Sequence, residues 1–280
     1  MLDAGWSAAS LAEGALGPRA GSCEARGMTS RILGEWLSEP FALTMSSGFF
    51  SFFAHTGALS TLEARGLLPT RVSGSSAGAL VTGAFAAGLS TEQLEAELTG
   101  LERAHFWDPK PGFGLLAGRL FHERLEAMLP VRTFEACRLP AAISVFDVRS
   151  RETQVRDRGD LALAIRASCT VPGLFHPVWA GPRPLLDGGI LDRPGLVGMP
   201  DGERVLFHHI VSRSPWRKAD SEGMRIPKRA NMVTLKIHGL PRSGPFRLGE
   251  GRRALELARE ATRRALSSAI GPDGVVDVEA

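Results

Sequence analysis

The chain contains few cysteines and no grouped metal ligands. Its 280 residues include only three cysteines, Cys23, Cys137 and Cys169, and no two of them form a CxxC pair. An odd and sparse set argues against a disulfide scaffold or a metal site, and it indicates reduced thiols in a reducing compartment. With 44% hydrophobic and 22% charged residues, the composition is that of an ordinary globular protein with a sizeable core. We therefore expect no metal and no cofactor.

Long apolar runs and blocks of one charge are also missing. The longest uncharged stretch, residues 40–62, contains many polar side chains, whereas a transmembrane helix needs about 20 predominantly apolar residues. The formal net charge is +3, and the 33 basic residues, only four of them lysine, are interleaved with acidic ones. This pattern is typical of a solvated surface and not of a nucleic-acid-binding tail, although arginine also suits an anionic membrane surface. The sequence predicts a cytoplasmic protein that binds no nucleic acid and associates with a membrane at most peripherally.

The N-terminal segment shows no sign of regular structure. Residues 1–28 carry acidic side chains and lack an apolar core, so they do not have the pattern of a secretory signal peptide. The segment is rich in Gly, Ala and Ser without helical or strand periodicity, and Met28 is a second candidate start. We expect residues 1–38 to form a disordered leader.

From residue 41 onward, predicted strands and helices alternate. Short apolar runs predict strands at residues 41–46, 70–74, 141–148, 153–157, 183–189, 203–212 and 231–237. Helical spacing predicts helices at residues 54–66, 76–88, 90–98, 119–129, 161–168 and 250–268, the third opened by a capping box of Ser90 and Gln93. Residues 105–118 and 213–230 are predicted loops, the second of them mobile and on the surface. The alternation indicates an α/β fold in three layers, with a mainly parallel sheet flanked by helices on both faces.

A five-residue motif carries the first candidate for chemistry. Gly74-Ser75-Ser76-Ala77-Gly78 fits G-x-S-x-G, with an apolar strand before it and a helix rich in Ala and Gly after it. In that setting the serine lies on a sharp strand-to-helix turn, and the flanking glycines avoid collisions with neighbouring backbone. The positive end of the helix favours negative charge that develops at the serine. Ser76 is therefore a candidate nucleophile.

A second motif, Asp187-Gly188-Gly189, follows a predicted strand. Taken alone, it has the pattern of a tight turn that an aspartate initiates. A carboxylate in such a turn also lies where another backbone can approach closely, because neither glycine has a side chain. The residues by themselves leave both interpretations open.

Three stretches together resemble the patatin-like phospholipase family. Residues 46–67 are similar to the family's oxyanion loop and following helix, residues 72–89 to its nucleophile elbow, and residues 166–195 to the segment that ends in its DG[AG] aspartate. The resemblance covers about residues 40–240. It implies a patatin-like acyl hydrolase domain over residues 39–240, with a C-terminal amphipathic helix and tail, residues 241–280, packed on the same domain.

The resemblance also implies the site. Ser76 would be the nucleophile and Asp187 the base of a Ser–Asp dyad, acting through an acyl-enzyme on phospholipids or other lipid esters. Backbone amides of Gly48, Phe49 and Ala77 would form the oxyanion hole, since backbone donors do not depend on side-chain identity. The family's loop usually has the form G-G-G-x-[RK]-G, whereas here only Gly48 remains and the basic residue is missing. A Phe at a loop position with positive φ would be costly.

Two other interpretations stay open at this point. In a conventional Ser–His–Asp esterase, His208 or His209 would be the base, because both follow Asp187 along the chain. Alternatively, the altered oxyanion loop suits a catalytically impaired protein that binds lipid or regulates a partner. Transfer of the acyl group to an acceptor other than water is a further outcome of the same chemistry.

The cluster of Phe residues in and after the oxyanion loop has two interpretations, core packing or the wall of an acyl pocket. The candidate pocket residues are Phe49, Phe50 and Phe52, together with His176 from the loop before Asp187. We expect Phe53 to lie in the core beneath the start of the following helix and His55 to be structural.

Overall fold

One large sheet organises the chain. The computed structural model describes residues 31–211 and 225–280, and within these ranges nine strands form a sheet in the order β11-β10-β9-β1-β2-β4-β8-β7, with β5 also paired to β4. The parallel strands are β1 (Ala42–Met45), β2 (Arg71–Ser75), β4 (Ala141–Asp147), β9 (Val205–Ile210), β10 (Met232–His238) and β11 (Val275–Glu279). The antiparallel strands are β5 (Glu152–Arg156), β7 (Val178–Ala180) and β8 (Arg183–Asp187). A separate pair joins β3 (Gly114–Leu116) to β6 (Gly173–Phe175).

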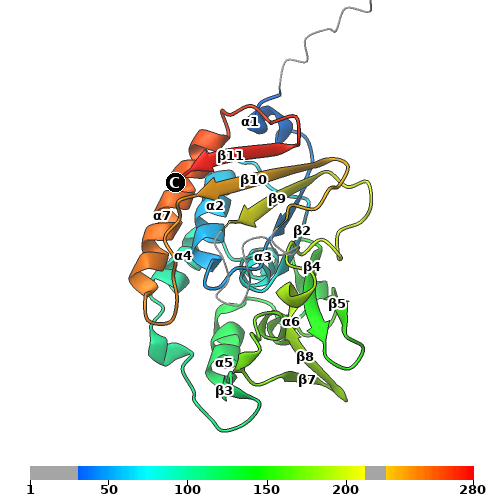
Figure 1. Ribbon diagram of the computed structural model, residues 1–280, viewed down its shortest axis with the longest axis vertical. Helices are drawn as coiled ribbons and strands as arrows, with labels where there is room; N and C mark the ends of the chain where they lie inside the picture. Colours follow the sequence, from blue (N-terminus) through cyan, green and yellow to red (C-terminus); the bar gives the residue numbers. More distant parts are fainter. Residues whose placement is uncertain (1–30, 212–224) are drawn as a thin grey trace, which may run out of the picture.

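Helices flank this sheet (Figure 1). They are α1 (Leu33–Trp36), α2 (Phe52–Ala64), α3 (Ala77–Ala87), α4 (Thr91–Thr99), α5 (Arg119–Met128), α6 (Leu161–Ser168) and α7 (Leu248–Ala265). In the described part of the chain, three short 3₁₀ helices are η1 (Arg103–His105), η2 (Phe134–Ala136) and η3 (Gly188–Ile190). None of the described helices combines the length and the hydropathy that a membrane crossing requires.

The main core lies between the sheet and the helices. Along β1, Leu43 and Met45 belong to this core, whereas Ala42 belongs to a small separate cluster with Met199 and Val205. Because side chains alternate across a strand, the two sets lie on opposite faces of the sheet. Residues 194–199 cross that second face, where the Thr44 hydroxyl donates to the Pro194 carbonyl at 2.7 Å.

Helix α7 packs alongside α2, as Figure 1 shows. The backbones approach closely at Gly57, where a Cβ would collide with the Leu255 carbonyl. The Thr61 hydroxyl donates to the Arg259 carbonyl at 2.9 Å across the same contact. The C-terminal helix thereby covers the helix that follows the loop at residues 46–51.

Most predicted elements are present, with ends shifted by a few residues, and the Ser90–Gln93 capping box of α4 is confirmed. The prediction of a disordered leader over residues 1–38 is wrong at its end, because α1 buries Leu33 completely and pairs its backbone with residues 266 and 268. Residues 1–30 and most of the predicted loop 213–230 lie outside the described residues. The predicted loop 105–118 contains β3, and the tail adds β11 to the sheet edge.

Candidate active site

Ser76 lies on the sharp turn between β2 and α3. It is the N-cap of α3, and its φ of 53° and ψ of −119° belong to a backbone region that residues with side chains rarely adopt. Two glycines permit the turn: a Cβ on Gly78 would collide with the Met45 carbonyl, and one on Gly74 with the backbone of Gly78. The first turn of α3 directs its unpaired N–H groups and positive end toward the serine.

The sheet register brings Asp187 to Ser76. Strand β5 occupies one edge of β4, and β2 and β8 follow each other along the opposite edge. There Ser75 of β2 pairs with Ser144, and Asp187 at the end of β8 pairs with the next residue, Val145, so the ends of β2 and β8 meet. The Ser76 hydroxyl donates a hydrogen bond to Asp187 Oδ2 at 2.6 Å. Both side chains are nearly buried, with exposed fractions of 7% and 5%. Asp187 Oδ1 accepts the backbone N–H of Gly189 at 2.8 Å, which orients the carboxylate.

The loop between β1 and α2 supplies free backbone donors beside Ser76. Among the described residues, the amides of Gly48 and Phe49 donate to no acceptor, and both residues line the same cavity as Ser76 and Ala77. Ala77 begins α3, where N–H groups lack intrahelical acceptors. Phe50 takes the positive φ of the loop, 55°, and its carbonyl accepts the Ser243 hydroxyl at 2.8 Å. The predicted oxyanion donors are therefore available in space.

Ser168 and Cys169, at the end of α6, hold the backbone of Ser76, and the sequence analysis did not identify them. The Ser168 hydroxyl accepts the Ser76 N–H at 2.8 Å and donates to the Ser144 carbonyl at 2.6 Å. The Cys169 thiol donates to the Ser76 carbonyl at 3.1 Å. Burial raises the pKa of the Cys169 thiol well above its usual range, and the negative charge of Asp187 raises it further. The thiol therefore stays protonated and serves as a hydrogen-bond donor.

The two candidate histidines of a triad have their hydrogen bonds elsewhere. His208 Nδ1 lies 2.9 Å from His55 Nδ1, and His55 Nε2 lies 2.8 Å from the Ser46 carbonyl oxygen. His209 Nδ1 lies 3.4 Å from Arg193 Nη1. Burial lowers the pKa of His208 to about 4 and that of His209 to about 3, so both rings are neutral near pH 7. Ser76 is instead bonded directly to the carboxylate of Asp187.

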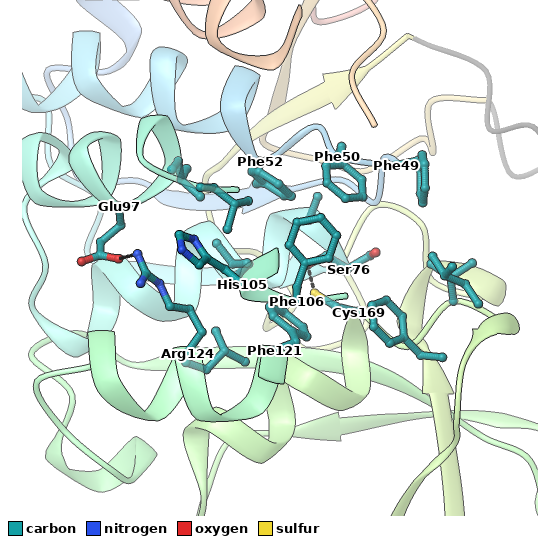
Figure 2. A pocket seen from close by; sticks show the side chains of 18 of the residues that line it. Phe49, Phe50, Phe52, Ser76, Glu97, His105, Phe106, Phe121, Arg124 and Cys169 are labelled. Carbon is teal, nitrogen blue, oxygen red and sulfur yellow. Dashed lines mark hydrogen bonds and ion pairs between the residues drawn. The ribbon is translucent and has the colours of Figure 1, made fainter. Parts of the chain in front are cut away.

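An apolar cavity of about 850 Å³, its open mouth included, adjoins Ser76 (Figure 2). Phe49, Phe50 and Phe52 line it, as the sequence predicts, and Phe53 is fully buried in the core. The rest of the apolar wall comes from α3, α4, the segments on either side of η1, α5, and the segment from the end of α6 through β6. Its residues are Leu80, Leu98, Leu101, Phe106, Phe121, Leu125, Met128, Val171, Leu174 and Phe175. In the sequence, residues 119–129 combine helical spacing with an apolar face, and this face forms the α5 part of the wall.

His176 does not line the cavity, contrary to the prediction. Its neighbour Phe175 lines the cavity at the end of β6, and consecutive side chains of an extended chain point in opposite directions. His176 Nε2 lies 3.0 Å from the Lys110 carbonyl oxygen, on the loop before β3. Within the described ranges, no three His, Cys, Asp or Glu side chains are grouped as a metal site requires.

A comparison with protein-family models matches residues 43–196 to the patatin-like phospholipases. The chain belongs to this family. The matched range contains the loop at residues 46–51, the elbow at Ser76 and the turn at Asp187, in that order.

Curated relatives and a solved structure are also similar to this chain. Uncharacterized NTE family proteins of Mycobacterium tuberculosis and Mycobacterium bovis are 32% identical over 154 residues, which is 54% of this chain and 43% of each relative. The chain therefore spans less than half the length of the curated relatives it matches. VipD from Legionella pneumophila shares the fold with a TM-score of 0.59 at 15% identity, over 82% of this chain and 67% of that one.

Proposed function

We propose that this chain is a lipid acyl hydrolase in which Ser76 is the nucleophile and Asp187 the general base. The observation that carries the proposal is the 2.6 Å hydrogen bond from the Ser76 hydroxyl to Asp187, at the wall of an apolar cavity. Membership of the patatin-like phospholipase family supports it. Phospholipids and other lipid esters are the substrate class, because the cavity offers apolar surface to an acyl chain.

The proposed reaction has two halves. In the first, Ser76 Oγ bonds to the ester carbonyl carbon while its proton moves to Asp187, and the carbonyl electron pair moves to the oxygen. Amides of Gly48, Phe49 and Ala77 bind this oxyanion. The carbonyl then re-forms, the bond to the alcohol breaks, and the leaving alcohol takes the proton from Asp187.

In the second half, water attacks the acyl-enzyme. Asp187 accepts a proton from the water, the oxyanion forms again, and the bond from the acyl carbon to Ser76 Oγ breaks. The proton returns to Ser76, and a carboxylic acid leaves. Because Asp187 is almost buried and its Oδ1 is held by Gly189, its Oδ2 is oriented toward the serine in both halves.

Labelling with a fluorophosphonate probe and hydrolysis of short nitrophenyl esters test this proposal. Ser76→Ala should abolish labelling, and Asp187→Asn should lower the hydrolysis rate by about 10²–10⁴-fold, the usual effect of a general base. Ser75→Ala is the matched control and should change neither labelling nor hydrolysis. The Ser75 hydroxyl is next to Ser76 in the sequence, is buried, and has no hydrogen-bond partner among the described residues.

Two outcomes would contradict the proposal. A folded wild-type chain that neither reacts with the probe nor hydrolyses any ester would favour the impaired lipid-binding interpretation. Complete loss of hydrolysis in folded His208→Gln or His209→Gln variants would favour the Ser–His–Asp interpretation.

A further inference from the structure

The cavity beside Ser76 ends in polar side chains. Figure 2 shows Glu97, Arg124 and His105 grouped at the end away from Ser76 and Phe49. Glu97 comes from α4, Arg124 from α5 and His105 from η1. Arg124 Nη2 donates to Glu97 Oε2, so an ion pair joins the two helices there. A wall that is apolar near the nucleophile thus has charged groups at its far end.

Helix α5 places Arg124 within an apolar row. Phe121, Arg124, Leu125 and Met128 line the cavity at intervals of three and four residues, so they share one face of the helix over about 10 Å. Arg119, on the same helix, does not line the cavity and pairs with Glu123 at 2.6 Å in a well-exposed position. The guanidinium of Arg124 is therefore the charge that this helix contributes to the cavity.

The far end offers hydrogen-bond donors. His105 Nδ1 accepts the backbone N–H of Glu102 at 3.2 Å, so in the neutral ring Nε2 carries the hydrogen. Arg124 uses Nη2 for Glu97, and among the described residues its Nε and Nη1 groups donate to no acceptor. The Arg124 and Glu97 side chains are each 36% exposed. N–H donors and a positive charge are thus available to a ligand that reaches this end.

We propose that this end of the cavity is a subsite for acyl chains that carry an oxygen group, a hydroxyl or a carboxylate, far from their ester. The inference rests on the proposed function and names the substrate class of the same site. An unsubstituted chain that reached Arg124 would displace water from its N–H groups without replacing the lost hydrogen bonds. A terminal oxygen would accept those hydrogen bonds, and a carboxylate would also interact with the guanidinium charge.

Binding to the Ser76→Ala protein tests the subsite independently of catalysis. Isothermal titration compares methyl dodecanoate, methyl 12-hydroxydodecanoate and the monomethyl ester of dodecanedioic acid. We expect both oxygenated esters to bind more tightly than methyl dodecanoate, and the dicarboxylic monoester to bind about five- to tenfold more tightly, as for a charge-assisted hydrogen bond in a partly exposed site.

Matched variants in the same Ser76→Ala background locate the effect. Arg124→Leu should remove the preference, Arg124→Lys should keep most of it, and Glu97→Gln should increase it, because a competing carboxylate is removed. Arg119→Leu is the control on the solvent side of α5 and should leave the preference unchanged.

A phosphate on the alcohol side of the ester would present similar oxygens, so a phosphocholine ester of unsubstituted dodecanoic acid forms a further arm. An Arg124→Leu effect on this ligand alone would overturn the proposal in favour of a headgroup site. Equal affinities for all three methyl esters, or a preference that survives Arg124→Leu, would also overturn it. Since binding needs no turnover, these results are separate from a failure of hydrolysis, which would count against the proposed function alone.

Discussion

The backbone conformation at Phe50 predicts that glycine is more stabilising than alanine at this position. Phe50 has a φ of 55°, whereas Phe49, its neighbour in the same loop, is not among the residues with positive φ. A side chain in the left-handed region costs about 1–2 kcal/mol, which glycine avoids because it has no Cβ. Glycine also costs about 0.4–1 kcal/mol through the greater freedom of the unfolded chain. At Phe50 the first effect should exceed the second.

The comparison uses Phe50→Gly with Phe50→Ala, and Phe49→Gly with Phe49→Ala. The Phe50 ring contacts Phe49, Phe52 and Phe106 at centroid distances of 5.0, 5.2 and 5.7 Å. Because both variants at one position lose the same ring, that loss cancels within each pair. We expect Phe50→Gly to be about 0.5–1 kcal/mol more stable than Phe50→Ala, and Phe49→Gly to be less stable than Phe49→Ala by a similar amount.

Urea unfolding measures the free energy of unfolding of the four variants. The difference between the two pairs should be about 1–2 kcal/mol, which equilibrium unfolding resolves when the slopes agree. If glycine is the less stable residue at both positions, the Phe50 backbone carries no strain and the reasoning fails.

Three further predictions concern the pH dependence of stability, the aromatic loop formed by Phe49, Phe50, Phe52 and Phe53, and binding to anionic membranes. His208, with a pKa of about 4 in the folded state against 6.5 ordinarily, stays neutral while the unfolded chain takes up a proton, so stability falls as pH falls below about 6.5. For this histidine the loss between about pH 7 and pH 5 is about 2 kcal/mol, and His208→Gln should remove it from urea-unfolding curves; an unchanged pH slope would contradict this. Phe53→Ala should cost about 3–5 kcal/mol, whereas Phe49→Ala should leave the melting temperature almost unchanged and alter chain-length preference in an ester series. If both variants only unfold, the aromatic loop serves the fold alone. Binding to anionic vesicles in a sedimentation assay should weaken as salt rises, since ions screen exposed charges; binding that persists unchanged in molar salt would refute an electrostatic attachment.

Local motifs account for the parts of the site that the sequence predicts. The elbow at Ser76 depends on which residues lack a Cβ, and Gly74 and Gly78 meet that need within five residues of sequence. The pairing with Asp187 was different, because the residues alone favoured a simple turn and the family resemblance supplied the partner. The hydrogen bond between them requires the register of three strands, which local sequence does not specify.

The parts that sequence reasoning missed depend on packing between distant elements. Nothing in the sequence distinguishes Ser168 from other serines, yet its hydroxyl accepts the Ser76 N–H because α6 ends beside the elbow. Likewise, whether Phe175 or His176 faces the cavity depends on the phase of a three-residue strand, β6. The far wall of the cavity comes from helices that meet only in the folded chain, so its charged end could not be predicted.

The position of β9 in the sheet limits how short a fragment of this protein can be and still fold. The family match ends at residue 196, but two later elements complete the fold. Every residue of β1 pairs with a residue of β9, and Gly251 of α7 packs against the ring of Phe53. A fragment cut at residue 196 would leave β1 as an open edge with unpaired backbone groups and would uncover the apolar side of α2. Such edges and patches promote self-association. The recognisable motif region is thus shorter than the unit that can fold, and expressing it alone should yield aggregates.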